Sequence, residues 1–240
     1  MKKKLKTSAS YILFFALSYN ALAQDSLIID YPGTTVPGNT PILFAPDIVG
    51  STAALNFRPD GQEFYFTQRL TSGKISVVTK YLDGEWTTPE QTLLHYDELL
   101  SDGTGFYYDY DTRDIYTFTW TPEGQSLPEH VYTTSNRILR LRASLNKNLY
   151  FSDDLGDANR NDIYICKYEN GQYLSPERLP NTINSSLMEE HCLIAPDESF
   201  IIFDVWTSTS STNPTYISYR KPDGKWTNRK KLGMDGIPFL

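Results

Sequence analysis

A turn motif occurs three times along the chain and limits the folds available to it. In each copy a run of strand-forming residues leads to Asp-Gly or Asn-Gly, and an aromatic residue follows two positions after the glycine. The three turns are Asp83-Gly84, Asn170-Gly171 and Asp223-Gly224. This dipeptide supplies the positive φ angles that a tight antiparallel hairpin requires. The motif therefore predicts antiparallel strand pairs along most of the chain.

A second motif precedes each of these hairpins at a similar distance. Pro59-Asp60-Gly61 leads into an apolar strand that ends at Phe66, and Pro196-Asp197 leads into one that ends at Phe203. Ser144–Phe151 follows the same pattern with asparagines in the turn. The strand ends and the hairpin glycines are 18, 20 and 21 residues apart, so each unit is predicted to hold four antiparallel strands. The fourth strands are expected to start at Trp86, Tyr173 and Trp226.

The middle of the chain is predicted to supply one further, shorter unit. We expect a turn at Asp109–Arg113 between the strands Gly105–Tyr108 and Ile115–Trp120. We call the residue that corresponds to Phe66 in each unit its anchor, and Thr117 is the predicted anchor of this unit. Its outer strand is expected to be missing or reduced because no Gly-x-Trp motif follows. The four anchors, 51, 34 and 52 residues apart, are then Phe66, Thr117, Phe151 and Phe203.

Four-stranded units that recur every ~40 to 50 residues are typical of β-propeller blades, which bury their faces against their neighbours. The predicted fold is therefore an all-β propeller of about four four-stranded antiparallel blades with the stub of a fifth. The last residues, Ile237–Leu240, stand about where the first strand of a next blade is expected. We favour a truncated or incompletely closed ring over a closed ring of four. A β-sandwich, with turns every ~8 to 12 residues, is the alternative fold.

The first 23 residues have the features of a secretory signal peptide. A basic segment at Lys2–Lys6 precedes an apolar run at Tyr11–Leu17, and Ala21-Leu22-Ala23 supplies the small residues of a cleavage site. The apolar run is shorter than the ~18 to 20 residues that span a bilayer. We expect cleavage after Ala23, an extended segment at 24–44, a propeller domain at 45–240 and no transmembrane segment in the mature chain. The predicted location is periplasmic or extracellular.

Charge disfavours a nucleic-acid partner. The formal net charge is −7, and four of the 22 basic residues lie within the first 23 positions, so 18 bases face 29 acids in the rest of the chain. A protein that binds nucleic-acid phosphates needs clustered cations, whereas this chain has an excess of acidic residues.

The two cysteines, Cys166 and Cys192, fall on predicted strands that are separated by an intervening strand. Disulfide geometry between such positions is unfavourable, so we expect two buried free thiols that behave as small apolar side chains.

The motifs together form a longer pattern, made of Phe57–Gly61 with Phe64–Phe66, Asp162–Tyr164, Gly171–Pro176, Leu179–Asn184 and Glu190–Asp197. This pattern resembles the WD40-like (PD40) repeats of TolB-type bacterial propellers, over roughly residues 45–233. The resemblance implies an exported propeller. It implies little about function, because this repeat occurs in periplasmic binding proteins, envelope complexes and some carbohydrate-active enzymes. The short second unit and the position of the chain end depart from the family pattern.

Glu189, Glu190 and His191 form the first candidate ligand-binding site. They lie at the start of a predicted innermost strand, which borders the central channel of a propeller. Two carboxylates and an imidazole at that place could coordinate a cation or relay protons. The alternative is a solvated loop with one satisfied core residue.

Tyr107, Tyr108, Asp109 and Asp111 form the second candidate ligand-binding site. Aromatic rings beside carboxylates suit sugar stacking and hydroxyl recognition, and a pair of carboxylates could cleave a glycosidic bond. Alternation along a strand would instead place half of these side chains in the core.

Asp157, Asn159 and Asn161 have the alternate spacing of calcium ligands. Asp162 stands where a calcium-binding EF-hand loop has glycine, and Tyr168 stands where it has a bidentate glutamate. We therefore expect no cofactor, with Ca²⁺ at these three residues as the alternative.

Neither a Gly-x-Ser-x-Gly nucleophile motif nor the Ser-x-Asp-x-Gly-x-x-Trp box of sialidase propellers occurs in the sequence. The predicted function is therefore a non-enzymatic exported propeller whose loops bind a protein or a glycan of the cell envelope. The alternatives are a carbohydrate-active propeller enzyme, either a glycosidase or a polysaccharide lyase, and an inactive fragment of a longer propeller protein.

Overall fold

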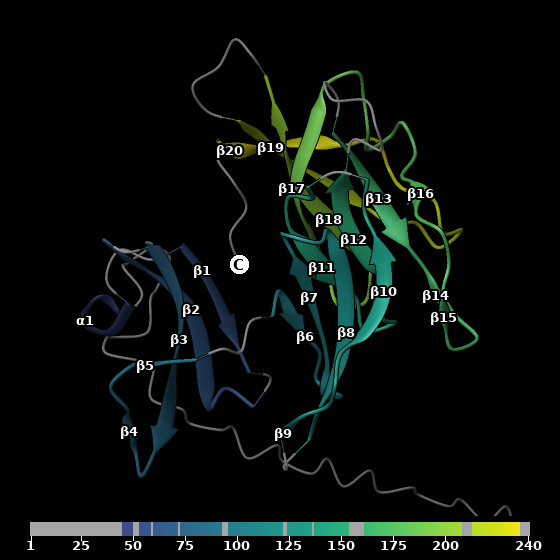
Figure 1. The fold of residues 1–240 in the computed structure, drawn as a ribbon. Helices are drawn as coiled ribbons and strands as arrows, with labels where there is room; N and C mark the ends of the chain where they lie inside the picture. Colours follow the sequence, from purple (N-terminus) through teal and green to yellow (C-terminus); the bar gives the residue numbers. More distant parts are fainter. Residues whose placement is uncertain are drawn as a thin grey trace, which may run out of the picture.

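Four antiparallel β-sheets follow one another in chain order as the blades of a propeller (Figure 1). This computed structural model describes residues 45–49, 53–58, 60–71, 73–92, 96–121, 124–135, 137–153, 161–207 and 213–235. Over these ranges no strand of the last blade pairs with the first, so hydrogen bonds do not close the ring. The predicted all-β propeller of four-stranded blades is confirmed. The expected signal peptide, the segment 24–44 and the residues expected to begin a fifth blade lie outside the described residues.

The bounds of the elements follow the blades. Blade one follows α1 (Pro46–Val49) and contains β1 (Ala53–Phe57), β2 (Glu63–Leu70), β3 (Gly73–Leu82), β4 (Glu85–Trp86) and β5 (Glu90–Gln91). Blade two contains β6 (Glu98–Leu99), β7 (Thr104–Asp109), β8 (Asp114–Thr121), β9 (Gly124–Gln125) and β10 (Glu129–Thr133). Blade three contains β11 (Leu141–Ala143), β12 (Leu149–Asp153), β13 (Asp162–Cys166), β14 (Tyr168–Glu169), β15 (Gln172–Tyr173) and β16 (Glu177–Arg178). Blade four contains β17 (Met188–Ile194), β18 (Phe200–Trp206), β19 (Pro214–Tyr219) and β20 (Lys230–Asp235). No helix in the described ranges has the length and apolar character needed to cross a bilayer.

Each outer strand starts directly after its hairpin turn. Its pairing with the third strand of the blade then shifts by one residue, because the outer strand has one extra residue between two paired positions. In blade one Tyr81 pairs with Trp86, whereas Val77 pairs with Gln91. Thr87 accommodates the extra residue, because its hydroxyl accepts the N–H of residue 80 at 3.0 Å and its own N–H donates to the carbonyl of that residue at 2.8 Å. Ser126 in blade two and Thr227 in blade four make the same pair of hydrogen bonds.

The predicted starts of the outer strands in blades one, three and four are confirmed by the pairings of Trp86, Tyr173 and Trp226.

Cys166 occupies a position that carries a hydroxyl in two other blades. Thr79 and Ser218 donate to the carbonyls of the outer strand at 2.6 and 2.7 Å, and the thiol of Cys166 lies 2.9 Å from the Leu174 carbonyl in the same way. Cys166 and Cys192 are both buried free thiols, as predicted. Burial raises the pKa of each thiol to about 12, so both remain protonated.

Blade two is a complete blade, and the prediction of a short unit was wrong. Its turn between first and second strands is Asp102-Gly103, where Gly103 has φ 84° and Asp102 accepts the N–H of Thr104 at 2.9 Å. The predicted turn Asp109–Arg113 instead joins the second strand to the third. The outer strand is present as β9 and β10. The sequence predicted only a short unit here because no Asp-Gly or Asn-Gly turn with a following aromatic residue occurs between Trp120 and Ile138. The turn Asp102-Gly103 nevertheless has the aspartate and the positive glycine φ of the Asp60-Gly61 turn in blade one.

The anchor predicted at Thr117 is therefore wrong, and Tyr107 takes its place. Tyr107 stacks on its cross-strand partner Tyr116 with ring centroids 5.1 Å apart. Phe151 with Tyr164 and Phe203 with Tyr216 make the same stacked pair in blades three and four. The anchors, now 41, 44 and 52 residues apart, are Phe66, Tyr107, Phe151 and Phe203.

The main apolar cores lie between neighbouring blades. Between blades one and two the core includes Tyr65, Val78, Tyr96 and Phe118. Between blades two and three it includes Phe106, Tyr108, Ile115, Leu149, Phe151 and Cys166. Between blades three and four it includes Tyr150, Ile163, Cys192, Ile201, Phe203 and Trp226. A further core lies on the other face of blade one. There Val49 of α1 and the preceding residue, Ala45, pack against strand residues of the blade, which are Phe64, Phe66 and Val77. Successive side chains of the middle strands thus enter two different cores, as alternation along a strand requires.

A buried carboxylate also joins blades three and four. Glu198, in the turn that precedes β18, accepts hydrogen bonds from Ser144 at 2.7 Å and from Asn148 at 2.6 Å, both in the corresponding turn of blade three. Arg220 forms an ion pair with its second oxygen. Burial alone would raise the pKa of Glu198, but these donors outweigh it and lower the pKa below the ordinary value. The ionised carboxylate therefore fixes one turn against the other.

One cross-strand pair is reversed in blade two. In blades one, three and four a large apolar residue on the second strand pairs with a small polar residue or cysteine on the third; these pairs are Phe64 with Thr79, Leu149 with Cys166, and Ile201 with Ser218. In blade two the pair is Gly105 with Phe118. A Cβ atom on Gly105 would lie 2.1 Å from the ring of Phe118, so the glycine is required for the phenylalanine to fit.

Replacing Gly105→Leu should lower the free energy of unfolding by about 1–3 kcal/mol, because the added side chain overlaps the ring of Phe118. In Gly105→Leu/Phe118→Thr the pair matches the other blades, so the double variant should be more stable than the sum of the two single variants predicts. Urea unfolding of the four proteins measures both effects. Additive losses would show that the two positions do not compensate each other.

Candidate functional site

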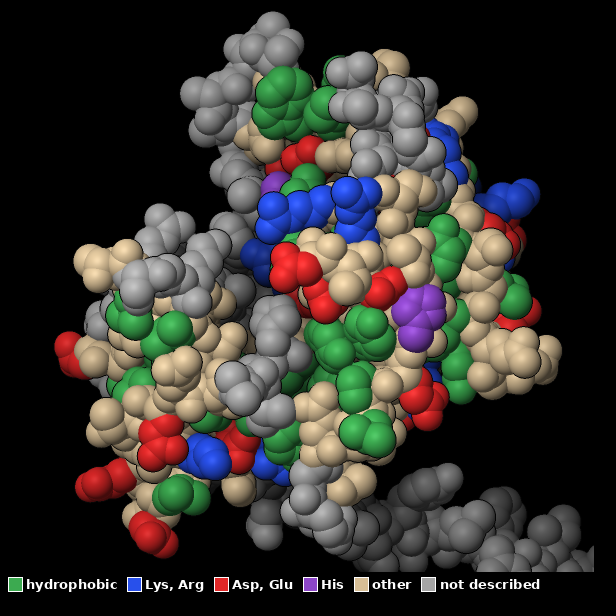
Figure 2. All heavy atoms as spheres, in the orientation of Figure 1, with side chains coloured by type: hydrophobic (Ala, Val, Ile, Leu, Met, Phe, Trp, Pro, Cys, Tyr) green, Lys and Arg blue, Asp and Glu red, His purple; other side chains and the backbone are tan. Residues whose placement is uncertain are grey.

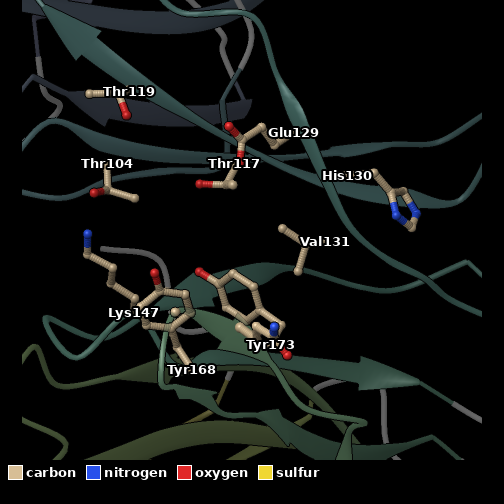
Figure 3. Close-up of a pocket in the computed structure, with 11 residues that line it drawn as sticks. Thr104, Thr117, Thr119, Glu129, His130, Val131, Lys147, Tyr168 and Tyr173 are labelled. Atoms are coloured by element: carbon tan, nitrogen blue, oxygen red, sulfur yellow. The ribbon is translucent and has the colours of Figure 1, made fainter.

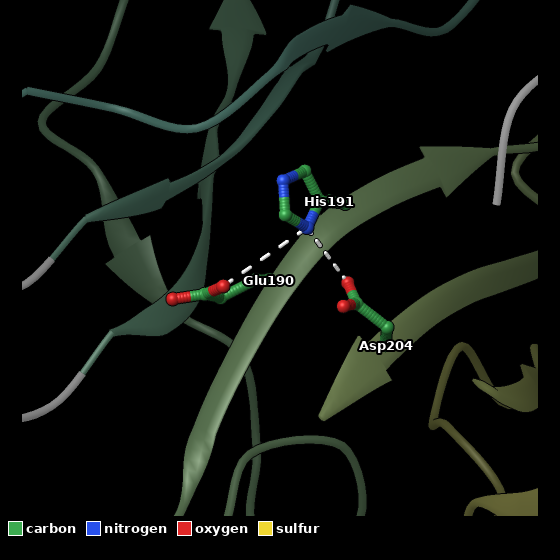
Figure 4. A group of neighbouring side chains, drawn as sticks. All are labelled: Glu190, His191 and Asp204. Carbon is green, nitrogen blue, oxygen red and sulfur yellow. Dashed lines mark hydrogen bonds and ion pairs between the residues drawn. The ribbon is translucent and has the colours of Figure 1, made fainter. Parts of the chain in front are cut away.

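Glu190, His191 and Asp204 meet on the first two strands of blade four (Figure 4). Glu190 pairs with Asp204 across β17 and β18, but Leu193 pairs with Ile202, so β17 carries one extra residue between these pairs. His191 lies in this bulge with φ 45°, a conformation that residues other than glycine seldom adopt. The bulge turns the imidazole toward the two carboxylates.

The imidazole of His191 is close to both acids. Its Nδ1 lies 2.9 Å from Oδ1 of Asp204 and 4.0 Å from Oε2 of Glu190. The Asp204 side chain is fully buried, and 19% of the His191 side chain is exposed. Figure 4 shows the second ring nitrogen of His191 directed away from both carboxylates.

Two asparagines hold the remaining carboxylate oxygens. Asn161 donates from Nδ2 to Oε1 of Glu190 at 2.8 Å, and Asn213 donates to Oδ2 of Asp204 at 2.7 Å. Each carboxylate therefore has one oxygen bound to an amide and the other oxygen near the imidazole. These hydrogen bonds fix the orientation of both acids.

The sequence pattern indicated Glu190 and His191 but not Asp204 and Asn213. Asp204 is a buried acid in the otherwise apolar strand β18, and that isolated charge was the one available signal. Asn213 follows residues 208–212, which lie outside the described part of the chain, and nothing in the sequence sets it apart from neighbouring polar residues.

Glu189 lies apart from this cluster. Its carboxylate is fully buried and accepts hydrogen bonds from Arg229 Nη1 at 2.6 Å and from the Ser185 N–H and hydroxyl at 3.0 and 2.5 Å. These contacts join β17 to the segments before it and before β20.

Among the predicted calcium ligands, Asn161 donates to Glu190, whereas Asp157 and Asn159 lie outside the described residues.

The four residues of the second predicted site do not face one another. Tyr107 is half-buried and stacks on Tyr116, whereas Tyr108 is buried and its hydroxyl lies 3.1 Å from that of Thr134. Asp109 accepts the N–H groups of the turn that follows it, and Asp111 is exposed in that turn. The alternation along β7 thus separates core residues from surface residues.

A polar groove between blades two and three was missed by sequence analysis (Figure 3). Its volume is about 390 Å³. It is lined by Thr104, Thr117, Thr119, Glu129, His130, Val131, Lys147, Tyr168, Gly171, Gln172 and Tyr173. Figure 3 shows the threonines across the groove from Lys147 and the two tyrosines. The lining residues come from distant parts of the chain, so no local motif could have revealed the groove.

Two aromatic rings form one wall of this groove. The rings of Tyr168 and Tyr173 have centroids 4.8 Å apart, and burial raises the pKa of the Tyr173 hydroxyl above its ordinary value. The ammonium group of Lys147 lies 6.0 Å from the Tyr168 ring and 3.1 Å from the carboxylate of Asp102. The wall thus combines rings, a neutral hydroxyl and a paired charge.

On the face shown in Figure 2, basic side chains form a small group flanked by acidic side chains rather than an extended cationic surface. This mixed distribution gives no support to a phosphate-rich partner. The absence of a nucleic-acid partner stays a prediction.

Comparison with known proteins supports the fold. No family model matches the chain, and no curated protein matches it. A solved structure from Agrobacterium tumefaciens, described as a TolB, is similar with a TM-score of 0.53 and 16% sequence identity, over 75% of this chain and 64% of that protein. TolB from Acinetobacter baumannii gives a TM-score of 0.44 at 12% identity, over 75% of this chain and 43% of that one. An engineered glycoside hydrolase of family GH43, with endo-xylanase and exo-arabinofuranosidase activity, gives 0.44 at 16% identity, over 78% and 42%.

The first of these structures alone has a TM-score above 0.5, so the comparison of folds depends on it. At 16% identity the similarity concerns the arrangement of strands and not the activity. The chain spans less than two thirds of the length of that protein. The chain thus has a β-propeller fold similar to that of a TolB-type protein.

Proposed function

We propose that this chain is a non-enzymatic binding module of the cell envelope, and that its ligand lies in the groove between blades two and three. The observation that carries the proposal is the groove itself, which is open, polar and lined by side chains from two blades. Binding sites commonly combine a concave surface with a few oriented polar groups.

The chemistry of the groove favours a hydroxyl-rich ligand, and we propose a glycan. Tyr168 and Tyr173 offer ring faces on which an apolar sugar face can stack. Three threonine hydroxyls, the amide of Gln172 and the carboxylate of Glu129 line the same space and can exchange hydrogen bonds with sugar hydroxyls. The charge of Lys147 is partly neutralised by Asp102, which suits a neutral ligand better than an anionic one.

A carbohydrate-active enzyme is the second candidate, because of the pair formed by His191 and Asp204. A buried carboxylate that holds Nδ1 of an imidazole leaves Nε2 available as a general base. Release of reducing ends from a bound glycan, abolished by His191→Gln, would favour this candidate over a binding module.

We predict that Tyr168→Ala and Gln172→Ala each weaken glycan binding, by about tenfold for the tyrosine, because its loss removes a stacking surface worth about 1 kcal/mol or more. A glycan array run on the mature protein identifies the ligand, and calorimetry with that glycan measures the affinities. Tyr219→Ala is the control, since Tyr219 is an exposed tyrosine on blade four that does not line the groove. Unchanged affinity in the groove variants, or an equal loss in the control, would exclude this groove as the binding site. Binding of a protein segment with no glycan binding would contradict the proposed ligand class.

We also propose that residues 1–23 direct export and are then removed, on the basis of the basic segment, the apolar run and the small residues before Gln24. When the full chain is expressed in a Gram-negative host, the protein recovered from the periplasm or medium should begin at Gln24. Intact-mass measurement and amino-terminal sequencing test this expectation. A cytoplasmic protein that retains residues 1–23 would refute it.

A further inference from the structure

We propose that Glu190, His191 and Asp204 bind one divalent transition cation, and that Zn²⁺ is the ion they fit best. This site is separate from the glycan groove and does not depend on the proposed function. Three potential ligand atoms converge there, one from each side chain, and all lie within 4.8 Å of one another.

The distances between these atoms suit a common ion. Zn²⁺ binds imidazole nitrogen and carboxylate oxygen at about 2.0–2.2 Å, so two ligands of a tetrahedral ion lie roughly 3.4 Å apart. The distances from His191 Nδ1 to the oxygens of Asp204 and Glu190 are 2.9 and 4.0 Å, one on each side of that value. Small side-chain rotations would therefore place all three atoms around one ion.

The surroundings of the acids match those of metal-binding carboxylates. Ligand carboxylates are usually hydrogen-bonded by neighbouring groups that fix their orientation. Asn161 and Asn213 supply such donors to the outer oxygens of Glu190 and Asp204, and leave the inner oxygens directed at the imidazole. Neither amide competes for the atoms that would bind the ion.

The composition of the site selects the type of ion. One imidazole nitrogen with two carboxylate oxygens suits a borderline cation such as Zn²⁺. Ca²⁺ requires 6–8 oxygen ligands, which three side chains with one nitrogen do not provide. Three protein ligands leave a fourth tetrahedral position for water or for an external ligand atom.

The chain offers a matched control in His130. Its Nε2 lies 3.2 Å from Asp114 Oδ1 and 3.0 Å from the Thr133 hydroxyl, so it forms a histidine–carboxylate pair without a second acid. Its side chain is 51% exposed. If any histidine beside an aspartate bound Zn²⁺, this pair would do so as well.

The test is calorimetric titration of Zn²⁺ into the mature protein after removal of metals with a chelator. We expect one ion per chain, with affinity reduced at least about tenfold in Asp204→Asn and His191→Ala and unchanged in His130→Ala. Asn161→Ala, which removes only an orienting donor, should weaken binding by about tenfold as well. Ca²⁺ at the same concentrations should not displace Zn²⁺.

A spectroscopic measurement separates loss of the site from loss of the fold. Co²⁺ in place of Zn²⁺ should give the visible absorption of a four-coordinate nitrogen and oxygen site in the wild type and in His130→Ala, and lose it in His191→Ala. Circular dichroism confirms that each variant is folded. Failure of the wild type to bind Zn²⁺, or equal binding by a folded His191→Ala variant, would overturn the proposal.

Discussion

Apolar packing between the faces of neighbouring blades is the interaction on which the whole structure depends. A single four-stranded sheet cannot bury both faces by itself, and hydrogen bonds within a sheet do nothing to hold one blade to the next. Tyr150 and Phe151 are adjacent in β12, yet one enters the core shared with blade four and the other the core shared with blade two. The fold is therefore a series of shared cores, in which Glu198 adds one fixed polar contact between two turns.

The sequence was sufficient to predict this architecture because its strongest signals are conformational requirements of the turns. Asn170 and Gly171 both have positive φ, as do Asp83 and Gly84, and these residue types tolerate that conformation at little cost. Blade two was predicted to be short because its outer strand follows no Asp-Gly or Asn-Gly turn and has no aromatic residue in the position of Trp86, Tyr173 and Trp226. Asp102-Gly103 has the conformation that matters, and the exchange of large and small residues between Gly105 and Phe118 also hides the similarity of this blade to the others.

The candidate sites were only partly predictable, because they depend on pairing across strands and blades. Glu190 and His191 are neighbours in sequence, but the bulge that turns His191 toward Asp204 depends on the register of β17 against β18. The groove combines Thr104 with Tyr173, which belong to different blades. Glu189 illustrates the opposite case: it lies beside Glu190 in sequence, yet alternation along the strand directs it to Arg229 and into a structural role.

Native-state hydrogen exchange tests the central claim, that neighbouring blades are stabilised by a shared apolar core. Phe203→Ala truncates a blade-four side chain that is buried against blade three, with an expected loss of about 3–5 kcal/mol. If the core is shared, the amides of β12 and β13 in blade three should lose as much protection as those of β18, because the two blades then open as one cooperative unit. Loss of protection confined to blade four, with β12 and β13 unchanged, would contradict the account.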